Sequence, residues 1–427
     1  MNASSTDRLT IALLFLFALF VFSSTFSIAL SQSSLGLSLL LFIVIAAKGD
    51  RSGFDRRLKW FWLAVALYVG WMLLAAMAGG KFLHSLDSMR EEWLFSIVLV
   101  GIFLIHKDDK NADRLIAILA VAQILVMLYS LGLYLDKVYI NPRYTEPLTS
   151  DQVVRIRGNF SHPLTFGNYT GTAALFMFGY ALAAHQRMAT WMRRLILSGG
   201  VAAMLCTLMS NSRGPIVAVL IGLVIMLFFL RRRKLLIGIV LLLSLGAASL
   251  LTETVRARFT AGHRTGIERH IGMYWQGSRR FIWTNSLKVI RENPVIGVGP
   301  GNFKEAYQEA VEGELHPMHR YGHAHNDLLN VSAQGGLVGG AAFGLMWLSV
   351  LLYFWIGYRR AGPGSAARAR SLAALLGSIL FLGTSVTEAT FVDEEVRALL
   401  MFIWAIGLSP WYKQGEQGFP VERQDFS

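Results

Sequence analysis

Cysteine and charged residues are both scarce in this sequence. The one cysteine, Cys206, lies inside an apolar stretch, so neither a disulfide framework nor a cysteine metal site can form within a single chain. Only 16% of the 427 residues are charged, whereas 54% are hydrophobic. A soluble domain of this length does not need so large an apolar fraction. The composition therefore excludes an ordinary soluble protein.

Signatures of nucleotide-dependent chemistry are also absent. The chain contains no P-loop, no glycine fingerprint of a dinucleotide-binding domain and no Asp-x-Asp that would hold a metal-bound nucleotide sugar. No pair of outward carboxylates can be assigned as the acid and base of a glycosidase. The net charge of +13 is spread over many loops rather than gathered in one domain, so nucleic acid is not an expected partner.

What the chain does contain is a succession of apolar stretches, separated by short charged segments. Such a pattern is typical of an all-α integral membrane protein that crosses the bilayer many times. It predicts about twelve transmembrane helices, near residues 9–30, 33–47, 60–79, 93–105, 115–135, 167–184, 195–209, 214–230, 235–251, 328–356, 371–391 and 399–412. Several are shorter than the roughly 20 residues that span a bilayer, so a merged or re-entrant pair is an open alternative.

The basic loops predict how these helices are oriented. Lys and Arg are concentrated in alternate loops, at 48–59, 106–114, 185–194, 231–234 and 359–370. By the positive-inside rule this side is cytoplasmic, which places both termini in the cytoplasm. The sequence then divides into residues 1–251 with spans one to nine, a large periplasmic loop at 252–327, and residues 328–427 with spans ten to twelve and a cytoplasmic tail.

The loop at 252–327 is expected to be partly helical. Its segment RRFIWTNSLKVIREN, residues 279–293, places apolar side chains at near-helical spacing and ends before Pro294. Because this helix would be amphipathic and rich in arginine and aromatic residues, we expect it to lie along the outer surface of the membrane.

A polar cluster precedes the tenth predicted span, in the stretch HAHNDLLNVSAQGGLVGG. Asn326 or Asp327 can cap that helix. If helical geometry begins at His325, Gly336 lies about three turns deeper on the same face, with Gly339 close by. A catalytic histidine would then stand above a groove open to a neighbouring helix or a lipid tail. Alternatively, the glycines make ordinary helix contacts and the histidine is a cap or a headgroup contact.

Four histidines in HPMHRYGHAH, residues 316–325, raise the alternative of a metal site. His316 and His319 are three apart and His323 and His325 are two apart, so together they could ligate zinc. No acidic or thiol ligand accompanies them, and the spacing matches no recognised zinc site. We therefore expect no metal and no other cofactor.

Basic residues recur at the predicted outer ends of the spans. They are Arg213 in SNSRGP, Lys81 in AGGKFLHS, and Arg155 and Arg157 in VVRIRGNFSHP. Taken singly, each is explained by a side chain that reaches the lipid headgroups. Taken with Arg279 and Arg280, they predict a basic outward pocket for phosphate or pyrophosphate. Lys81 and Arg157 are assigned to this pocket by charge alone.

The same residues resemble the signature of bacterial O-antigen ligases. His325 and Asn326, followed by nine residues, Gly336, two residues and Gly339, fit the pattern H-[NSQ]-x9-G-x-x-[GTY] of that family. RRFIWTNSLKVIRENPVIGVGPGNF, residues 279–303, is similar to a stretch common to the wider ligase and polymerase superfamily. FSHPLTFGNY and SNSRGP are similar to other outer segments of that superfamily.

The resemblance implies an integral-membrane glycosyltransferase with twelve spans and a large periplasmic loop between the ninth and tenth. Such enzymes transfer O-antigen glycan from undecaprenyl pyrophosphate to lipid A–core at the periplasmic face of the bacterial inner membrane. The implied reaction is metal-independent and inverting. Carried over by motif, His325 would be the general base, with His323 as a competitor for that role. Arg213 and Arg280 would bind the pyrophosphate of the donor.

Three other functions stay open. An O-antigen polymerase shares the donor but uses a second lipid-linked glycan as its acceptor, and a protein-directed oligosaccharyltransferase uses a protein. From a different class, an anion transporter would also suit twelve spans with basic outward residues. A transporter predicts broken helices or charges near the middle of the bilayer and paired halves, which we do not find in the sequence. For the ligase that the resemblance implies, the expected partners are the lipid-linked donor, lipid A–core and membrane lipids.

Overall fold

The computed structural model describes residues 5–50, 56–140, 155–183, 188–229, 238, 278–311 and 320–411. Every regular element within these ranges is a helix, which confirms the expected all-α class. Apart from residue 238, the expected ninth span, 235–251, lies outside the described residues, as does the first part of the predicted periplasmic loop.

Apolar helices make up most of the described chain. They are α1 (Ser5–Ser23), α2 (Ile28–Ala47), α3 (Lys59–Ala78), α5 (Ser96–Lys107), α6 (Lys110–Leu135), α7 (Pro163–Leu182), α8 (Thr190–Met209), α9 (Arg213–Phe229), α15 (Asp327–Arg360), α16 (Ala366–Ser385) and α17 (Glu394–Leu408). By length and composition, 6 helices in the described ranges can cross a membrane: α2, α3 with the turn before it, α6, α8, α15 and α16. The protein is a membrane protein, and the count of twelve spans stays a prediction.

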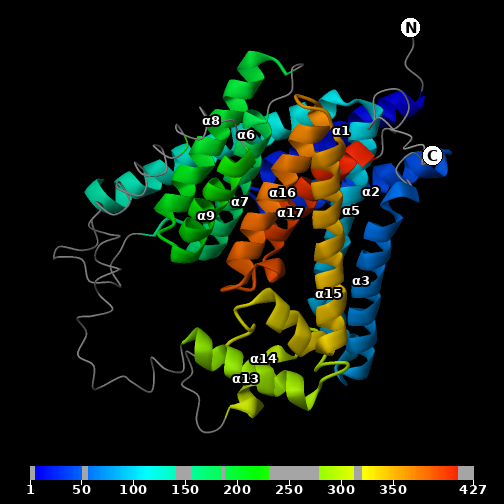
Figure 1. Ribbon diagram of the computed structural model, residues 1–427, viewed down its shortest axis with the longest axis vertical. Helices are drawn as coiled ribbons and strands as arrows, with labels where there is room; N and C mark the ends of the chain where they lie inside the picture. Colours follow the sequence, from blue (N-terminus) through cyan, green and yellow to red (C-terminus); the bar gives the residue numbers. More distant parts are fainter. Residues whose placement is uncertain are drawn as a thin grey trace, which may run out of the picture.

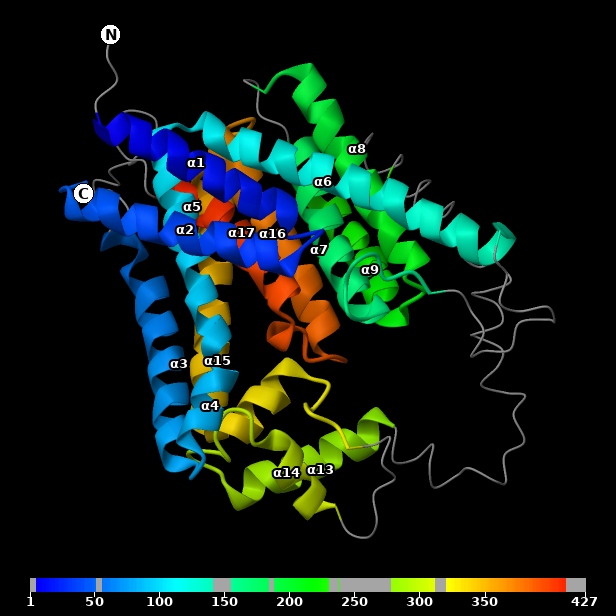
Figure 2. The ribbon, with the colours of Figure 1, turned by 180° about the vertical axis from the view of Figure 1, so that it is seen from behind.

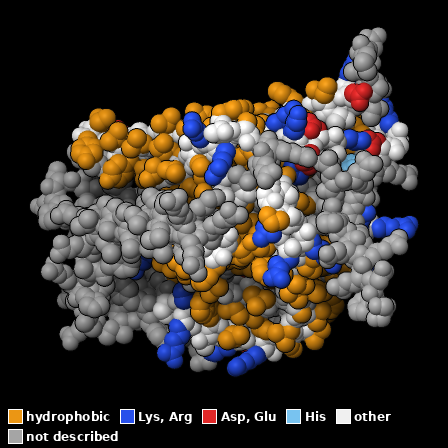
Figure 3. Space-filling view, turned by 45° about the horizontal axis from the view of Figure 1, so that its top comes forward, with side chains coloured by type: hydrophobic (Ala, Val, Ile, Leu, Met, Phe, Trp, Pro, Cys, Tyr) orange, Lys and Arg blue, Asp and Glu red, His pale blue; other side chains and the backbone are white. Residues whose placement is uncertain are grey.

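The outward faces of the long helices are apolar as well as their buried faces. On α3, Leu63 is 47% exposed, Leu67 49% and Leu74 56%. Figure 3 shows apolar side chains over wide areas of one face of the molecule. Exposed apolar surface of this extent is what helices in contact with lipid present.

Helices α7, α16 and α17 form the centre of the bundle (Figures 1 and 2). Every residue of α7 from Thr165 to Ala181 is buried, and Trp404 of α17 is fully enclosed. A helix that is buried all round is normally apolar all round. The polar side chains near the start of α7 therefore need a local reason.

Loops predicted to be cytoplasmic lie together at one end of the bundle. Lys107 Nζ lies 2.5 Å from Asp50 Oδ2, and Arg370 Nη1 lies 2.8 Å from Asp109 Oδ1. These two ion pairs join three of the predicted cytoplasmic loops. Their grouping agrees with the predicted topology, while the direction in which this end faces stays a prediction.

A small lobe lies beyond the other end of the bundle, where α3 and α15 extend past the other helices (Figure 1). It contains α13 (Arg279–Glu292) and α14 (Phe303–Ala310), and its core includes Ile282, Val289 and Tyr307. The bounds of α13 closely match the predicted helix. Its apolar face packs inside the lobe with α14 and α15, however, so the expectation that this face lies on the membrane is wrong.

Helix α15 is kinked at Gly336, where φ is 67° and ψ is −175°. The turn that follows α13 fits into the kink, because Leu337 N donates a hydrogen bond to the carbonyl oxygen of Pro294 at 2.8 Å. A Cβ at Gly336 would lie only 2.1 Å from the carbonyl oxygen of Val295. Both the positive φ and the close approach of the turn therefore require glycine.

The groove expected beneath the polar cluster is thus filled by a turn of the same chain. The helix begins at Asp327, and the protein atoms nearest to a Cβ at Gly336 belong to the backbone of Val295 and Ile296. Gly339 instead makes the helix contact named as the alternative, since a Cβ there would lie 3.2 Å from Trp71 of α3. The Trp71 indole donates to the carbonyl oxygen of Gly335 at 2.7 Å, beside the kink.

Gly336→Ala should destabilise the protein, because alanine at this position would adopt a strained φ and would clash with Val295. We expect a loss of about 1–3 kcal/mol or more, measured as a lower thermal unfolding midpoint in detergent. Gly344→Ala is the matched control in the same helix, because a Cβ there meets no atom within 4 Å. Equal midpoints for the two variants would show that the turn does not require glycine at the kink.

Candidate active site

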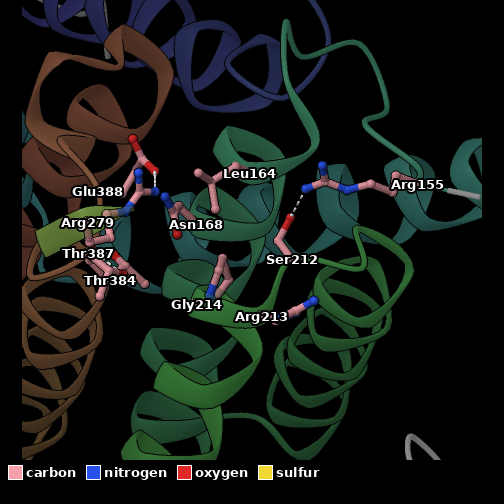
Figure 4. A pocket seen from close by; sticks show the side chains of 11 residues that line it. Arg155, Leu164, Asn168, Ser212, Arg213, Gly214, Arg279, Thr384, Thr387 and Glu388 are labelled. Atoms are coloured by element: carbon pink, nitrogen blue, oxygen red, sulfur yellow. Dashed lines mark hydrogen bonds and ion pairs between the residues drawn. The ribbon is translucent and has the colours of Figure 1, made fainter. Parts of the chain in front are cut away.

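A cavity of about 400 Å³ lies where the bundle meets the lobe (Figure 4). Its walls come from the starts of α7, α9 and α13, the segment after α16 and the segment before α7. The side chains that give it its chemical character are Arg155, Asn168, Ser212, Arg213, Arg279 and Glu388. With three arginines and one carboxylate among its described lining residues, the cavity is polar and basic.

One wall of the cavity is suited to an anion. Arg155 donates from Nη2 to Ser212 Oγ at 2.9 Å, which holds its guanidinium beside the start of α9. Arg213 is the first residue of that helix. The first turn of a helix carries unpaired N–H groups and the positive end of the helix dipole, so it adds to the attraction for a negative ligand.

The capping residue Asn326 fixes the position of His325. Its side-chain oxygen accepts from Leu329 N at 2.9 Å and so begins α15, while its side-chain nitrogen donates to the carbonyl oxygen of Val386 at 3.0 Å. His325 precedes this cap in the left-handed region, with φ of 49°. A non-glycine residue in this region stores strain, which is a recurrent feature of functional sites.

Glu388 joins His325 to the cavity. His325 Nδ1 lies 2.5 Å from Glu388 Oε1, and Arg279 Nη2 lies 3.0 Å from Glu388 Oε2. Burial acts to raise the pKa of Glu388, but the hydrogen bond and charge of His325 and the charge of Arg279 more than offset it, so the net pKa is lowered. Glu388 is therefore a carboxylate at neutral pH.

The ionised Glu388 also fixes the tautomer of His325. A carboxylate can only accept hydrogen bonds, so Nδ1 of the imidazole carries the proton and donates it to Glu388. In the neutral form of the imidazole, Nε2 then carries the lone pair. This atom is buried and has no hydrogen-bond partner among the described residues. The arrangement matches what a general base needs: an oriented imidazole with an accepting nitrogen.

The competing histidine, His323, occupies a different position. Its Nδ1 accepts from the backbone N–H of His325 at 3.3 Å. Burial, together with the charges of His325 and Arg279, lowers the pKa of His323 to about 4. His323 is therefore neutral at pH 7, and it supports the backbone that presents His325. The geometry favours His325 as the base, and this assignment stays a proposal.

The predicted basic residues divide between the cavity and the surface. Arg213, together with Arg155 and Arg279, lines the cavity. Arg280, Lys81 and Arg157 are exposed residues outside that lining. Their predicted role in binding pyrophosphate stays a prediction.

Two features of this site go beyond what the sequence specifies. Adjacent residues on a helix point about 100° apart, so choosing Arg279 over Arg280 required knowing which face of α13 meets the bundle. Glu388 is absent from the sequence-based prediction. Its signal was an acidic residue within an expected span, 371–391, which is a reason to suspect function.

The structure brings together a different set of candidate metal ligands from the one that the sequence suggests. His316 and His319 lie outside the described residues. His323, His325 and Glu388 offer three ligand atoms within 4.8 Å of one another, a set that suits a divalent metal by type. The carboxylate is already shared between an imidazole and a guanidinium, however, and the positive charge of Arg279 at 3.0 Å opposes a cation there. The donor set fits a hydrogen-bonded catalytic pair better than a metal.

One segment of the chain matches a known protein family. Residues 198–344 match the model of a family described as O-antigen ligase. This segment of the chain is similar to the O-antigen ligase superfamily. The matched segment contains Arg213, Arg279 and His325, whereas Glu388 lies beyond it.

A curated protein is similar to this chain over a comparable share of its length. An uncharacterized protein from Haemophilus influenzae is 25% identical over 166 residues, which make up 36% of this chain and 41% of the relative. The similarity therefore spans about two-fifths of the relative's length. Its description names no activity, so it adds no information about substrate.

The charge of Glu388 should stabilise the folded protein. Because its pKa is lowered on folding, the stabilisation is present above the ordinary pKa of a glutamate and is lost as the pH falls through the folded-state pKa. Glu388→Gln should lower the unfolding midpoint at pH 7 by an amount equivalent to about 1–3 kcal/mol, and the difference should shrink at pH 4. Asp87→Asn, whose side chain is 74% exposed, is the control. A difference that does not change with pH would contradict the ionised pair.

Proposed function

We propose that this protein transfers O-antigen glycan from undecaprenyl pyrophosphate to lipid A–core, at the periplasmic face of the bacterial inner membrane. The observation that carries the proposal is the pair of His325 and Glu388 at the edge of a cavity lined by Arg155, Arg213 and Arg279. A base and an anion-binding wall are the two features that displacement of pyrophosphate by a hydroxyl requires. The match to O-antigen ligases supports this substrate class.

In the proposed reaction, a hydroxyl oxygen of the acceptor attacks the anomeric carbon of the donor sugar. The new bond forms on one face as the bond to the pyrophosphate oxygen breaks on the other, so the configuration inverts. His325 Nε2 takes the hydroxyl proton, and Glu388 stabilises the imidazolium that results. The electron pair of the broken bond leaves with undecaprenyl pyrophosphate.

The anion-binding wall, which contains Arg155 and Arg213, stabilises the departing pyrophosphate. Negative charge grows on the leaving group as the bond breaks, and charge-assisted hydrogen bonds from Arg213 and Arg155 become stronger as it does. The start of α9 adds the field of its dipole. Arg279 also forms an ion pair with Glu388, so it belongs both to the lining of the cavity and to the catalytic pair. The donor is activated by its own pyrophosphate, so the reaction needs no ATP.

Related reactions are the second candidates. An O-antigen polymerase or a protein-directed oligosaccharyltransferase would use the same base and anion wall with a different acceptor. A transporter is less well supported, because transport sites are commonly lined by broken helices with free backbone groups. The break in α15 at Gly336 is instead filled by the turn at Pro294.

A deletion strain separates the ligase from the polymerase. Loss of polymer attached to lipid A–core, with the lipid-linked polymer retained, is the result expected for a ligase, whereas loss of the long polymer itself would indicate a polymerase. Complementation tests the base: wild type and His323→Ala should restore attachment, and His325→Ala should not. Restoration by His325→Ala at equal protein levels would remove this residue as the base.

Variants of the arginines test the anion wall in an assay of purified protein with EDTA present. Arg213→Ala should lower kcat/KM for the donor by about 10²-fold, and Arg213→Lys should recover little of it, because lysine lacks the planar fork of donors. Arg280→Ala is the comparator: the sequence-based assignment predicts a loss there too, whereas the lining of the cavity predicts activity near wild type. Equal losses at Arg213 and Arg280 would support the sequence-based assignment over the cavity wall. Loss of activity in EDTA would support a metal.

A further inference from the structure

Asn168 of α7 is a buried amide at the cavity without a partner. It lines the cavity and is 0% exposed. Neither its Oδ1 nor its Nδ2 has a hydrogen-bond partner among the described residues. An unsatisfied buried amide is uncommon in proteins and costs stability, so its presence calls for a functional reason.

Two neighbouring polar groups of α7 have partners, and a third, Thr172 Oγ1, is buried without one but does not line the cavity. Thr165 Oγ1 donates to Asp393 Oδ2 at 3.1 Å, and Thr170 Oγ1 lies 2.9 Å from Thr207 Oγ1. Both threonines also lie on the first turns of the helix. The amide of Asn168 is therefore distinguished by facing the cavity, rather than by belonging to a generally polar helix end.

The position of Asn168 indicates what it would contact. Figure 4 shows its side chain next to the pair formed by Arg279 and Glu388, with Arg155 and Arg213 farther along the cavity. If the pyrophosphate lies at Arg155 and Arg213 and the anomeric carbon faces the catalytic pair, the first sugar of the donor lies over Asn168.

We propose that Asn168 hydrogen-bonds a neutral polar substituent, a hydroxyl or an acetamido group, on the first sugar of the lipid-linked donor. This inference rests on the proposed function and names the part of the donor that the cavity selects. An amide both donates and accepts, which complements such a substituent, whereas an ionised phosphate can use only the donor of the amide. A buried group that is satisfied only by the correct substrate rejects an analogue that lacks the partner.

Donor analogues test this proposal. The probes are short-chain polyprenyl pyrophosphates whose first sugar either keeps its polar substituents or lacks one of them, as a deoxy analogue at each position in turn. Wild type should prefer the complete donor over at least one deoxy analogue. Asn168→Leu, similar in size but unable to hydrogen-bond, should reduce that preference in kcat/KM by about 10- to 100-fold. Asn168→Ala should reduce it as well and serves as the second variant if the leucine variant does not fold.

A control variant and an inhibitor distinguish a contact with the sugar from a contact with the pyrophosphate and from a general effect on α7. Thr170→Val removes a buried hydrogen bond of α7 away from the cavity and should leave the preference unchanged. Inhibition by a sugar-free polyprenyl pyrophosphate should be the same in wild type and both Asn168 variants. An unchanged preference, or weaker inhibition in the Asn168 variants, would overturn the contact with the sugar. A wild-type protein that uses no lipid-linked donor would instead overturn the proposed function.

Discussion

The carboxylate of Glu388 holds the candidate site together. One oxygen accepts a hydrogen bond from His325, and the other pairs with Arg279. Three segments that are distant in the sequence thus meet on one side chain. A buried charge is stable only when it is paired, so the folded arrangement of these segments depends on both partners. The same contact sets the tautomer of the imidazole, which makes the chemistry depend on it too.

The start of α15 in turn holds the segment that carries this carboxylate. Asp327 Oδ1 accepts from Phe391 N at 3.0 Å, and Asn326 donates to the carbonyl oxygen of Val386 at 3.0 Å. Consecutive residues therefore fix the segment on both sides of Glu388. The asparagine of the signature has a structural role, because it caps the helix and positions the group that orients the histidine.

Features that depend on neighbouring residues were predictable from the sequence. The bounds of α13 and the cap at Asn326 follow from local spacing and side-chain chemistry. The pairing of His325 with Glu388 joins residues 63 apart, and no local pattern specifies such a distance. Gly336 belongs to the predicted signature, but glycine is required there because a turn from another part of the chain packs against it.

A double-mutant cycle between His325 and Glu388, measured as kcat/KM for glycan transfer by the purified protein, tests the central claim most directly. If the carboxylate acts only through the imidazole, Glu388→Gln should cost almost nothing in a chain that already carries His325→Ala. The double variant should then be as active as His325→Ala alone. Losses that multiply would show that the two residues act independently, and would contradict the proposed catalytic pair.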